Sequence, residues 1–354
     1  MPTENMIRIP IETHTPYEVL IGKGVLANTG TEIRRVAAEA KKAFIVSDDT
    51  VLALYGKSVR DSLVAAGFRV YTLAFAHGEE HKTLATAEKI LSTLCAAEIT
   101  RTDVLVALGG GVVGDVCGFV AAIYLRGVKF VQIPTTLLAA VDSSVGGKTG
   151  VDLPAGKNLA GAFHQPSAVV CDTEILSVLP DRLFSEGMAE VIKYGMIGNA
   201  AFFGALENGQ ADLETIVETS VRAKAEIVKK DEFDKGERML LNFGHTFGHA
   251  IEKLSGFSLS HGEGVAMGMV FACRYADKIG YSQEADIAKR LSAVLARYRL
   301  PAASPFTGRE LFAAMVNDKK RRGDTISLIL PRSAGDARIV PVPMETFKEV
   351  LTGL

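Results

Sequence analysis

The sequence predicts an α/β protein in which a mostly parallel sheet domain precedes a mainly α-helical domain. Short apolar runs alternate with helical patterns in the first half, and helical patterns dominate after Leu179-Pro180. The chain of 354 residues also exceeds the length at which one hydrophobic core usually stops growing. We therefore expect two domains, residues 1–178 and residues 179–354.

The first half begins with an expected β-hairpin, whose strands at 7–11 and 17–21 are joined through Thr15-Pro16. The apolar runs that follow have the length of buried parallel strands, and helical patterns at 51–66 and 84–97 lie between them. Right-handed crossovers then place helices on both faces of the sheet. These buried strands are expected at 43–46, 68–75, 104–108, 130–133 and 168–171.

The second half reads as a set of helices closed by a small hairpin. Two short strands, 325–330 and 337–340, flank a turn that contains proline and glycine. The helical patterns cover 186–196, 213–229, 245–254, 264–279 and 285–298.

Composition excludes several classes of function. The formal charge of −2 is unlike that of a general nucleic-acid binder, and no apolar run reaches the length of a membrane span. The start of the chain has no cationic segment followed by an apolar stretch, so we expect no export. The cysteines are far apart in the sequence, which favours reduced thiols and a cytoplasmic protein. They are Cys95, Cys117, Cys171 and Cys273.

A glycine-rich turn follows the apolar run at 104–108. Gly109, Gly111 and Gly114 have the spacing of a dinucleotide-binding fingerprint, in which backbone amides and a helix N-terminus meet a pyrophosphate. This indicates a Rossmann-like domain, although the same glycines also fit a tight structural turn. No acidic residue ends a strand about twenty residues later, as the fingerprint requires. Asp48 is placed either to bind the ribose or to cap a helix.

A second glycine stretch, Ser143 to Thr149, resembles the end of a phosphate-binding loop. The glycine that such a loop requires at its start is replaced by Asp142, which disfavours an NTPase. Lys148 remains a candidate contact for a phosphate or a carboxylate. Other basic residues among small neighbours also fit a polyanionic small substrate, though each one alone fits an ordinary surface residue. They are Lys157, Lys193, Lys224 and Arg238.

Histidines and a buried carboxylate point to a metal. His245 and His249 are four apart on a helix and face the same way, and His261 is close enough in sequence to join them. The pattern equally fits hydrogen-bonded core histidines. Thr246 stands where zinc peptidases carry a glutamate, which disfavours peptidase chemistry. Glu190 lies in an apolar helix and needs a cation or a metal to offset its burial.

Several motifs in this order resemble the 3-dehydroquinate synthase family, within the sugar-phosphate cyclases. The resemblance runs over nearly the whole chain. It is carried by Gly78 to Lys82, Gly109 to Asp115, Pro134 to Leu138, Asp142 to Thr149, Gly187 to Gly195 and Leu241 to His249.

This resemblance implies an NAD- and metal-dependent lyase that eliminates phosphate. Glu190, His245 and His261 would bind zinc, with cobalt as an alternative, and His249 would contact substrate or relay protons. The residues implied for NAD are Asp48, Glu79, Lys82, Gly111, Val112, Val113, Gly114, Asp115, Thr135, Thr136, Asp142, Lys148 and Lys157. Those implied for the anionic sugar-phosphate substrate are Lys148, Asn158, Lys193, Lys224, Arg238, Asn242, His249 and one of Lys319 or Lys320.

The resemblance also implies a homodimer, because Arg126 matches a residue that reaches the phosphate from a partner subunit. Two positions depart from the family pattern. Asp234 stands where a glutamate is usual, four residues before Arg238, and Val178 stands where a threonine is common beside the cofactor. The resemblance therefore implies no role for Asp234 and no hydroxyl contact with the cofactor at Val178.

The sequence leaves three alternative functions to consider. One is another sugar-phosphate cyclase acting on sedoheptulose or glucose phosphate, which Asn242 and His249 disfavour. Another is a metal-dependent NAD alcohol or polyol dehydrogenase, which the anion-binding lysines and Glu190 disfavour. A non-catalytic nucleotide-binding module leaves the histidines unexplained.

Overall fold

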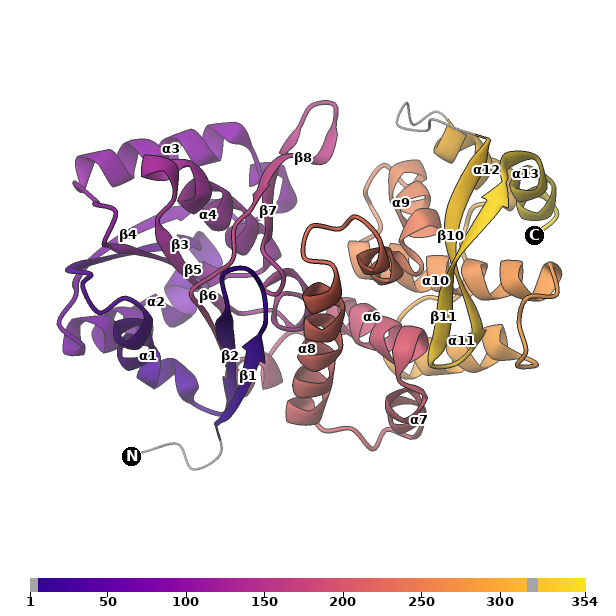
Figure 1. Cartoon of the computed structure of the whole chain (residues 1–354), viewed down its shortest axis with the longest axis horizontal. Coiled ribbons are helices and arrows are strands. Elements are labelled where there is room, and N and C mark those ends of the chain that lie inside the picture. Colours follow the sequence, from indigo (N-terminus) through magenta and orange to yellow (C-terminus); the bar gives the residue numbers. More distant parts are fainter. Residues whose placement is uncertain (1–5, 317–323) are drawn as a thin grey trace. The chain divides into compact units, whose positions relative to one another are not determined.

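The computed structural model describes residues 6–316 and 324–354, which form two compact units (Figure 1). Unit 1 comprises Met1–Pro180 together with Leu213–Phe233, and unit 2 comprises Asp181–Asp212 and Asp234–Leu354. The expected boundary at 178/179 lies two residues from the first division. The expectation of an unbroken second domain is wrong, because the segment Leu213–Phe233 belongs to unit 1.

Unit 1 is built on a seven-stranded sheet of order β1-β2-β9-β6-β5-β3-β4. The pair β1–β2 is antiparallel, and every other pairing in the sheet is parallel. All of the strands expected in this half are present. Their bounds are β1 Ile7–Ile11, β2 Tyr17–Gly22, β3 Lys42–Asp48, β4 Arg69–Phe75, β5 Val104–Gly109, β6 Lys129–Pro134 and β9 Ala168–Asp172.

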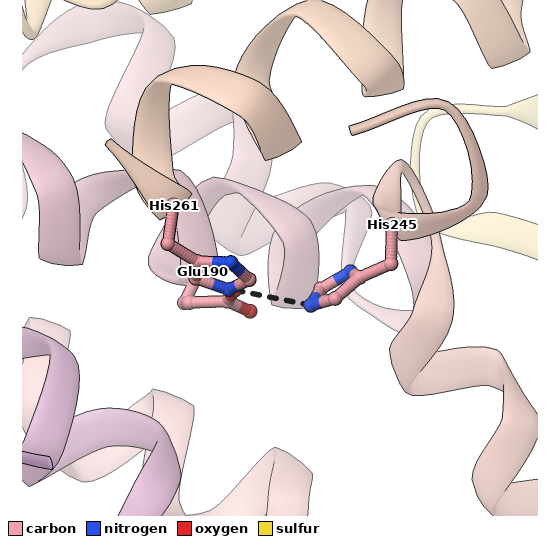
Figure 2. A group of neighbouring side chains, drawn as sticks. All are labelled: Glu190, His245 and His261. Carbon is pink, nitrogen blue, oxygen red and sulfur yellow. Dashed lines mark hydrogen bonds and ion pairs between the residues drawn. The ribbon is translucent and has the colours of Figure 1, made fainter. Parts of the chain in front are cut away.

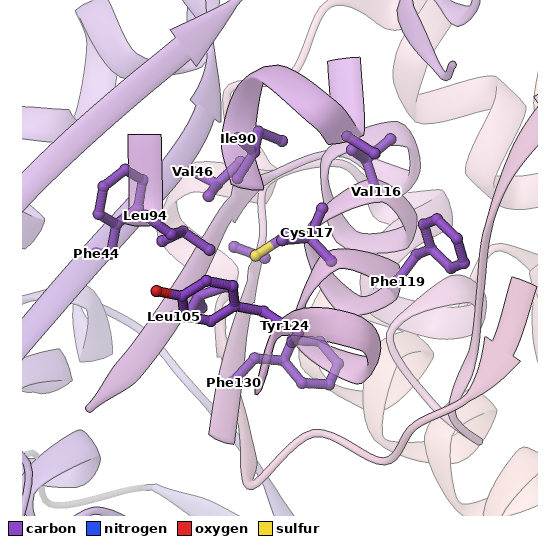
Figure 3. Packing of buried hydrophobic residues seen from close by; sticks show 14 of the residues in the cluster. Phe44, Val46, Ile90, Leu94, Leu105, Val116, Cys117, Phe119, Tyr124 and Phe130 are labelled. Carbon is purple, nitrogen blue, oxygen red and sulfur yellow. The ribbon is translucent and has the colours of Figure 1, made fainter. Parts of the chain in front are cut away.

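Helices pack on this sheet through an apolar core. Residues of β3 and β5 bury their side chains against α3 and α4, as Figure 3 shows around Val46, Leu94 and Cys117. Every residue of β5 is buried, as a central parallel strand requires. The helices of this half are α1 Thr29–Val36, α2 Asp49–Ala65, α3 Leu84–Ala96, α4 Gly111–Ile123 and α5 Thr173–Ser177. Short helical turns are η1 Val25–Asn28, η2 Glu79–His81, η3 Tyr124–Arg126 and η4 Ala139–Ser143.

A second hairpin in unit 1, β7 Lys148–Leu153 paired with β8 Gly156–Phe163, was not expected from the sequence. Its strands approach closely at two opposed glycines. A Cβ on Gly161 would lie 2.3 Å from the backbone oxygen of Thr149, and one on Gly150 would lie 2.8 Å from that of Ala160. These glycines allow the close approach of the two backbones.

Helix α8, Leu213–Lys230, accounts for the return of the chain to unit 1. It buries an apolar stripe that includes Ile216, Val217 and Val221, and it contacts β1, β2, α5 and η4. An amphipathic helix needs a partner for its apolar stripe, and the antiparallel edge of the sheet supplies one. Sequence continuity alone gave no sign of this partner.

Unit 2 is mainly helical, which confirms the fold class (Figure 1). Helix α10, His261–Lys278, is buried along nearly its whole length and packs against α6, α9, α11 and strand β10. The C-terminal hairpin is present and is longer than expected, with β10 Thr325–Ser333 and β11 Asp336–Pro343. The remaining elements are α6 Asp181–Gly198, α7 Ala200–Asn208, η5 Glu237–Asn242, α9 His245–Leu254, α11 Ile287–Arg297, α12 Gly308–Val316 and α13 Met344–Thr352.

Among the residues that the structure describes, no helix is both long and apolar enough to cross a membrane.

Candidate metal centre and nucleotide-binding loop

Two helices of unit 2 cross in direct backbone contact because glycines line their interface. A Cβ on Gly268 of α10 would lie 2.0 Å from the backbone oxygen of Gly244, immediately before α9. A Cβ on Gly248 of α9 would lie 2.9 Å from the backbone of Gly264. Only glycine leaves room for this approach. The crossing brings the start of α10, with His261, next to the histidines of α9.

Helix α6 is held close to α10 in the same way. A Cβ on Gly262 would lie 2.6 Å from the Cα and the oxygen of Glu186. Glu190 lies one turn further along α6, so this contact carries its carboxylate towards His261. The start of α10, where His261 lies, is also fixed, because Ser260 and Glu263 form a reciprocal capping box.

The three helices bring Glu190, His245 and His261 together, as Figure 2 shows. The Oε1 atom of Glu190 lies 3.4 Å from Nε2 of His245 and 3.2 Å from Nε2 of His261. One candidate ligand atom from each residue falls within 4.8 Å of the others. A carboxylate and two imidazoles leave a fourth position open, which is the usual donor set of a catalytic zinc site.

Hydrogen bonds on the far side of each ring select the atom that faces the cluster. The Nδ1 atom of His245 lies 3.2 Å from the carbonyl oxygen of Phe243, and Nδ1 of His261 lies 2.8 Å from Oε1 of Glu252. A carbonyl and an ionised carboxylate only accept, so Nδ1 carries the proton in both rings. Nε2 is then the atom of each ring that faces the cluster, and its lone pair would be free for a metal when the ring is neutral, as metal ligands require.

The cluster is strongly charged, and its carboxylate is buried while its two histidines are partly exposed. Glu190 is fully buried, and its Oε2 atom pairs with the ammonium group of Lys193, which is 1% exposed. Burial raises the pKa of Glu190, but Lys193 and the two histidines outweigh it and hold the pKa well below its usual value. Burial lowers the pKa of His261, whereas its bonds to Glu190 and Glu252 raise it to about 10. A divalent cation fits this site because it would take the place of the proton that the Glu190 carboxylate and a histidine ring share.

His249 lies beside the cluster and is exposed, with its ring centre 5.5 Å from that of His245. A second grouping of potential ligands, His249, Glu252 and His261, also falls within 4.8 Å. Both groupings need His261, and its Nδ1 is already bonded to Glu252. We therefore favour Glu190, His245 and His261 as the metal ligands, and the role of His249 stays a prediction.

The glycine turn of unit 1 follows β5 and leads into α4. Gly110 is the N-cap of α4, and the backbone amide of Thr135 donates to the oxygen of Gly109 at 3.0 Å. A Cβ on Gly109 would lie 2.5 Å from the side chain of Val113, and one on Gly114 would lie 2.5 Å from Oε1 of Gln132. These glycines thus allow α4 to pack closely on the sheet, and they leave its N-terminus suited to an anion.

Polar residues predicted for NAD form a network near this helix. Nζ of Lys82 lies 2.7 Å from Oδ2 of Asp115 and 2.6 Å from Oδ1 of Asn158. Burial lowers the pKa of Lys82, but Asp115 and Glu79 reverse this and raise it. Lys157 lies 3.7 Å from Glu79. The structure therefore joins residues predicted for the cofactor with Asn158, which was predicted for the substrate.

Other predicted residues of unit 1 lie at strand ends or, in the case of Lys224, on helix α8. Asp48 accepts a hydrogen bond from the amide of Val51 at 2.8 Å, which confirms its helix-capping alternative. Thr135 is buried, and Oγ1 of Thr136 accepts from the amide of Ala139 at 3.2 Å. Lys224 pairs with Asp142 at 2.9 Å, within unit 1. Lys148 begins β7 and is exposed.

The remaining predicted residues differ in their surroundings. Arg238 is 2% exposed, whereas Asn242 is exposed. Arg126 is exposed and lies in a tight turn with positive φ, 65°, next to Leu125 at 49°. The departures from the family pattern are Asp234, with φ 57°, and the exposed Val178. Lys319 and Lys320 lie outside the described residues.

Sequence reasoning missed Glu252. It lies seven residues after His245 and three after His249, so all three side chains share one face of α9. A carboxylate placed directly after Ala250-Ile251 on a histidine-bearing helix face was the signal that could have found it.

Comparisons with known proteins identify the family of this chain. Family models described as 3-dehydroquinate synthase N-terminal and C-terminal match residues 72–186 and 187–321. A 3-dehydroquinate synthase of Symbiobacterium thermophilum is 46% identical over 335 residues, which cover 92% of this chain and 94% of that protein.

Two solved structures are similar over their whole length. A 2-deoxy-scyllo-inosose synthase complexed with carbaglucose-6-phosphate, NAD+ and Co2+ has a TM-score of 0.87 and 27% identity, covering 99% of both chains. A 2-epi-5-epi-valiolone synthase of Streptomyces hygroscopicus with NAD+ and Zn2+ has a TM-score of 0.85 and 28% identity, covering 98% of this chain and 99% of that chain. From its matches to both family models and to this relative, the chain belongs to the 3-dehydroquinate synthase family.

Proposed function

We propose that this chain converts 3-deoxy-D-arabino-heptulosonate 7-phosphate to 3-dehydroquinate and phosphate. The observation that carries the proposal is the cluster of the buried Glu190 with His245 and His261, in which Nε2 of each ring lies 3.2–3.4 Å from the carboxylate. It occurs in a chain of the 3-dehydroquinate synthase family. The similar cyclases hold NAD+ with Co2+ or Zn2+, and we extend both kinds of cofactor to this chain.

Each cofactor fits residues of this chain. Glu190, His245 and His261 would hold the metal, and the N-terminus of α4 with Lys82, Asp115 and their neighbours would hold NAD. When bound, NAD supplies a reversible hydride acceptor, and the metal supplies a Lewis acid for a substrate hydroxyl. Because the hydride is returned, the reaction has no net redox change and the enzyme is a phosphate-eliminating lyase.

The chain's own residues would bind the substrate, orient it and move its protons. Lys148, Lys193, Lys224 and Arg238 offer cationic groups for its carboxylate and phosphate. His249 is exposed beside the metal cluster and is the candidate for proton relay at a substrate hydroxyl. Holding the ring-opened form of the substrate in position favours its intramolecular ring closure.

We further propose that the enzyme is a homodimer in which Arg126 serves the partner's site. Arg126 is exposed in a tight turn with positive φ, and this position suits a side chain that reaches outwards. We also expect it to act in the cytoplasm, because its cysteines are dispersed and unpaired among the described residues.

The decisive experiment supplies metal-loaded protein with the heptulosonate phosphate and a catalytic amount of NAD. We expect phosphate release together with a product that an added dehydratase converts to a conjugated, ultraviolet-absorbing compound. Stoichiometric accumulation of NADH would instead indicate a dehydrogenase. Turnover of sedoheptulose 7-phosphate without turnover of the heptulosonate would overturn the substrate assignment in favour of another cyclase.

A further inference from the structure

Glu252 is a buried carboxylate that the proposed chemistry does not use. It lies on α9 and is 3% exposed, and its Oε1 atom is 2.8 Å from Nδ1 of His261. His261 in turn places Nε2 3.2 Å from Oε1 of Glu190. The three residues therefore form a chain of carboxylate, imidazole and carboxylate that crosses from α9 through α10 to α6.

The packing around Glu252 is built to admit this carboxylate. A Cβ on Gly264 would lie 3.0 Å from Cγ of Glu252, so any larger residue there would press on the glutamate. The helices α9 and α10 are already in backbone contact through Gly244, Gly248 and Gly268. An ion pair is therefore not needed to join these helices. For a buried charge that only joined them, the desolvation penalty would exceed the electrostatic gain.

We propose that Glu252 is a positioning residue for the metal centre: it accepts the Nδ1 proton of His261 and so fixes Nε2 as the ligand atom. This inference rests on the metal site of the proposed function. An ionised carboxylate only accepts hydrogen bonds, so it selects one of the two neutral tautomers of the ring. Its negative charge also makes the imidazole a stronger ligand, and removal of such a partner typically weakens metal binding about 10–100-fold.

The test compares Glu252→Gln with Glu263→Gln in the full-length protein. Glu263 begins the same helix and bonds the amide of Ser260 at 2.8 Å, so its substitution controls for damage to the start of α10. Zinc affinity is measured by competition with a chromogenic chelator. We expect the zinc affinity of Glu252→Gln to fall about 10–100-fold, and that of Glu263→Gln to stay at the wild-type value.

A spectroscopic readout separates positioning from a purely structural role. In zinc-loaded protein labelled with 15N-histidine, NMR should show His261 protonated at Nδ1 in the wild type and a changed Nδ1 signal in Glu252→Gln. Glu252→Asp keeps the charge and should recover part of the lost zinc affinity. A lower melting temperature of the metal-free Glu252→Gln protein, with unchanged zinc affinity and unchanged Nδ1 signal, would reduce Glu252 to a packing residue and overturn the inference.

His261→Ala distinguishes failure of this inference from failure of the metal site itself. If His261→Ala binds zinc as tightly as the wild type, both the site and the role of Glu252 are overturned. If His261→Ala loses zinc while Glu252→Gln retains it fully, only the positioning role fails. Absence of phosphate release from the heptulosonate, with zinc binding as expected, would refute the proposed reaction and leave the role of Glu252 supported.

Discussion

The metal centre of unit 2 and the glycine turn of unit 1 are assembled by opposite means. The turn is a contiguous segment, Gly109 to Asp115, at the end of a buried strand, and the groups that it offers to an anion are backbone amides at a helix N-terminus. The metal centre gathers side chains from α6, α9 and α10, and 71 residues of sequence separate Glu190 from His261. A contiguous site depends on local geometry, whereas a dispersed site depends on how its helices pack.

The largest expected effect tests the division of roles within the dispersed site. His261→Ala should lose bound metal and all turnover, because it removes one of three ligands. His249→Ala should keep the metal and lose turnover by about 10²–10⁴-fold, because it removes a proton relay. Metal content by mass spectrometry and phosphate release from the heptulosonate measure the two effects. Equal metal loss in both variants would contradict the division.

The next prediction tests whether helix packing controls the metal centre. Gly268→Ala places a Cβ 2.0 Å from the backbone oxygen of Gly244, so α9 and α10 must separate. We expect a loss of about 2–3 kcal/mol in the free energy of unfolding, together with weaker zinc binding. Urea denaturation and chelator competition measure the two changes.

Gly204→Ala is the matched control, since Gly204 lies inside α7 with no atom within 4 Å of an added Cβ. It should leave zinc binding unchanged and stabilise the protein by up to about 1 kcal/mol, because alanine favours a helix. A zinc affinity of Gly268→Ala equal to that of this control would show that the crossing does not position the ligands.

A corresponding substitution in unit 1 should affect stability without reaching the metal. A Cβ on Gly118 of α4 would lie 2.4 Å from Cγ2 of Thr149 and 3.1 Å from the ring of Phe130. We expect Gly118→Ala to cost about 1–2 kcal/mol and to leave zinc affinity unchanged. Gly114→Ala should cost less, because its obstacle is the flexible end of Gln132. Loss of zinc from Gly118→Ala would show that zinc binding in unit 2 also depends on packing in unit 1.

The smallest expected effect concerns Asp103, which ties β3 to β5 in unit 1 without a metal. Its carboxylate accepts from the amides of Lys42 and Thr100, both at 2.8 Å. Burial raises its pKa, but these hydrogen bonds outweigh burial and lower the pKa below its ordinary value. Because the folded pKa is depressed, the stabilisation is present above about pH 4 and is lost as pH falls through the folded value.

Asp103→Asn should therefore lower the free energy of unfolding by about 1 kcal/mol at pH 7 and by less at pH 3. Urea denaturation of both proteins at the two pH values measures the gap. A gap of the same size at both values would show that the charge of Asp103 does not stabilise the sheet.

Most of unit 1 was predictable because its signals are local. Short apolar runs such as 104–108 are buried strands, and the glycines that follow mark the turn into α4. The hairpin β7–β8 was missed because its facing glycines, Gly150 and Gly161, interrupt the alternation of a strand. The packing of α8 in unit 1 was missed because an apolar stripe in the sequence does not identify the element that it packs against. Only the folded structure shows that α8 contacts β1 and β2.

The sequence by itself determined the fold class and the glycine turn, since these depend on composition and short-range spacing, and the candidate metal ligands came from the family resemblance. Tertiary structure decided which ligand atoms meet. Spacing alone would pair His245 with His249, yet the glycine-lined crossing of α9 and α10 and the contact of Gly262 with Glu186 bring Glu190 to His245 and His261. It also decided the position of Glu252, because a carboxylate can orient a distant imidazole only where backbones pack closely enough for the two to meet.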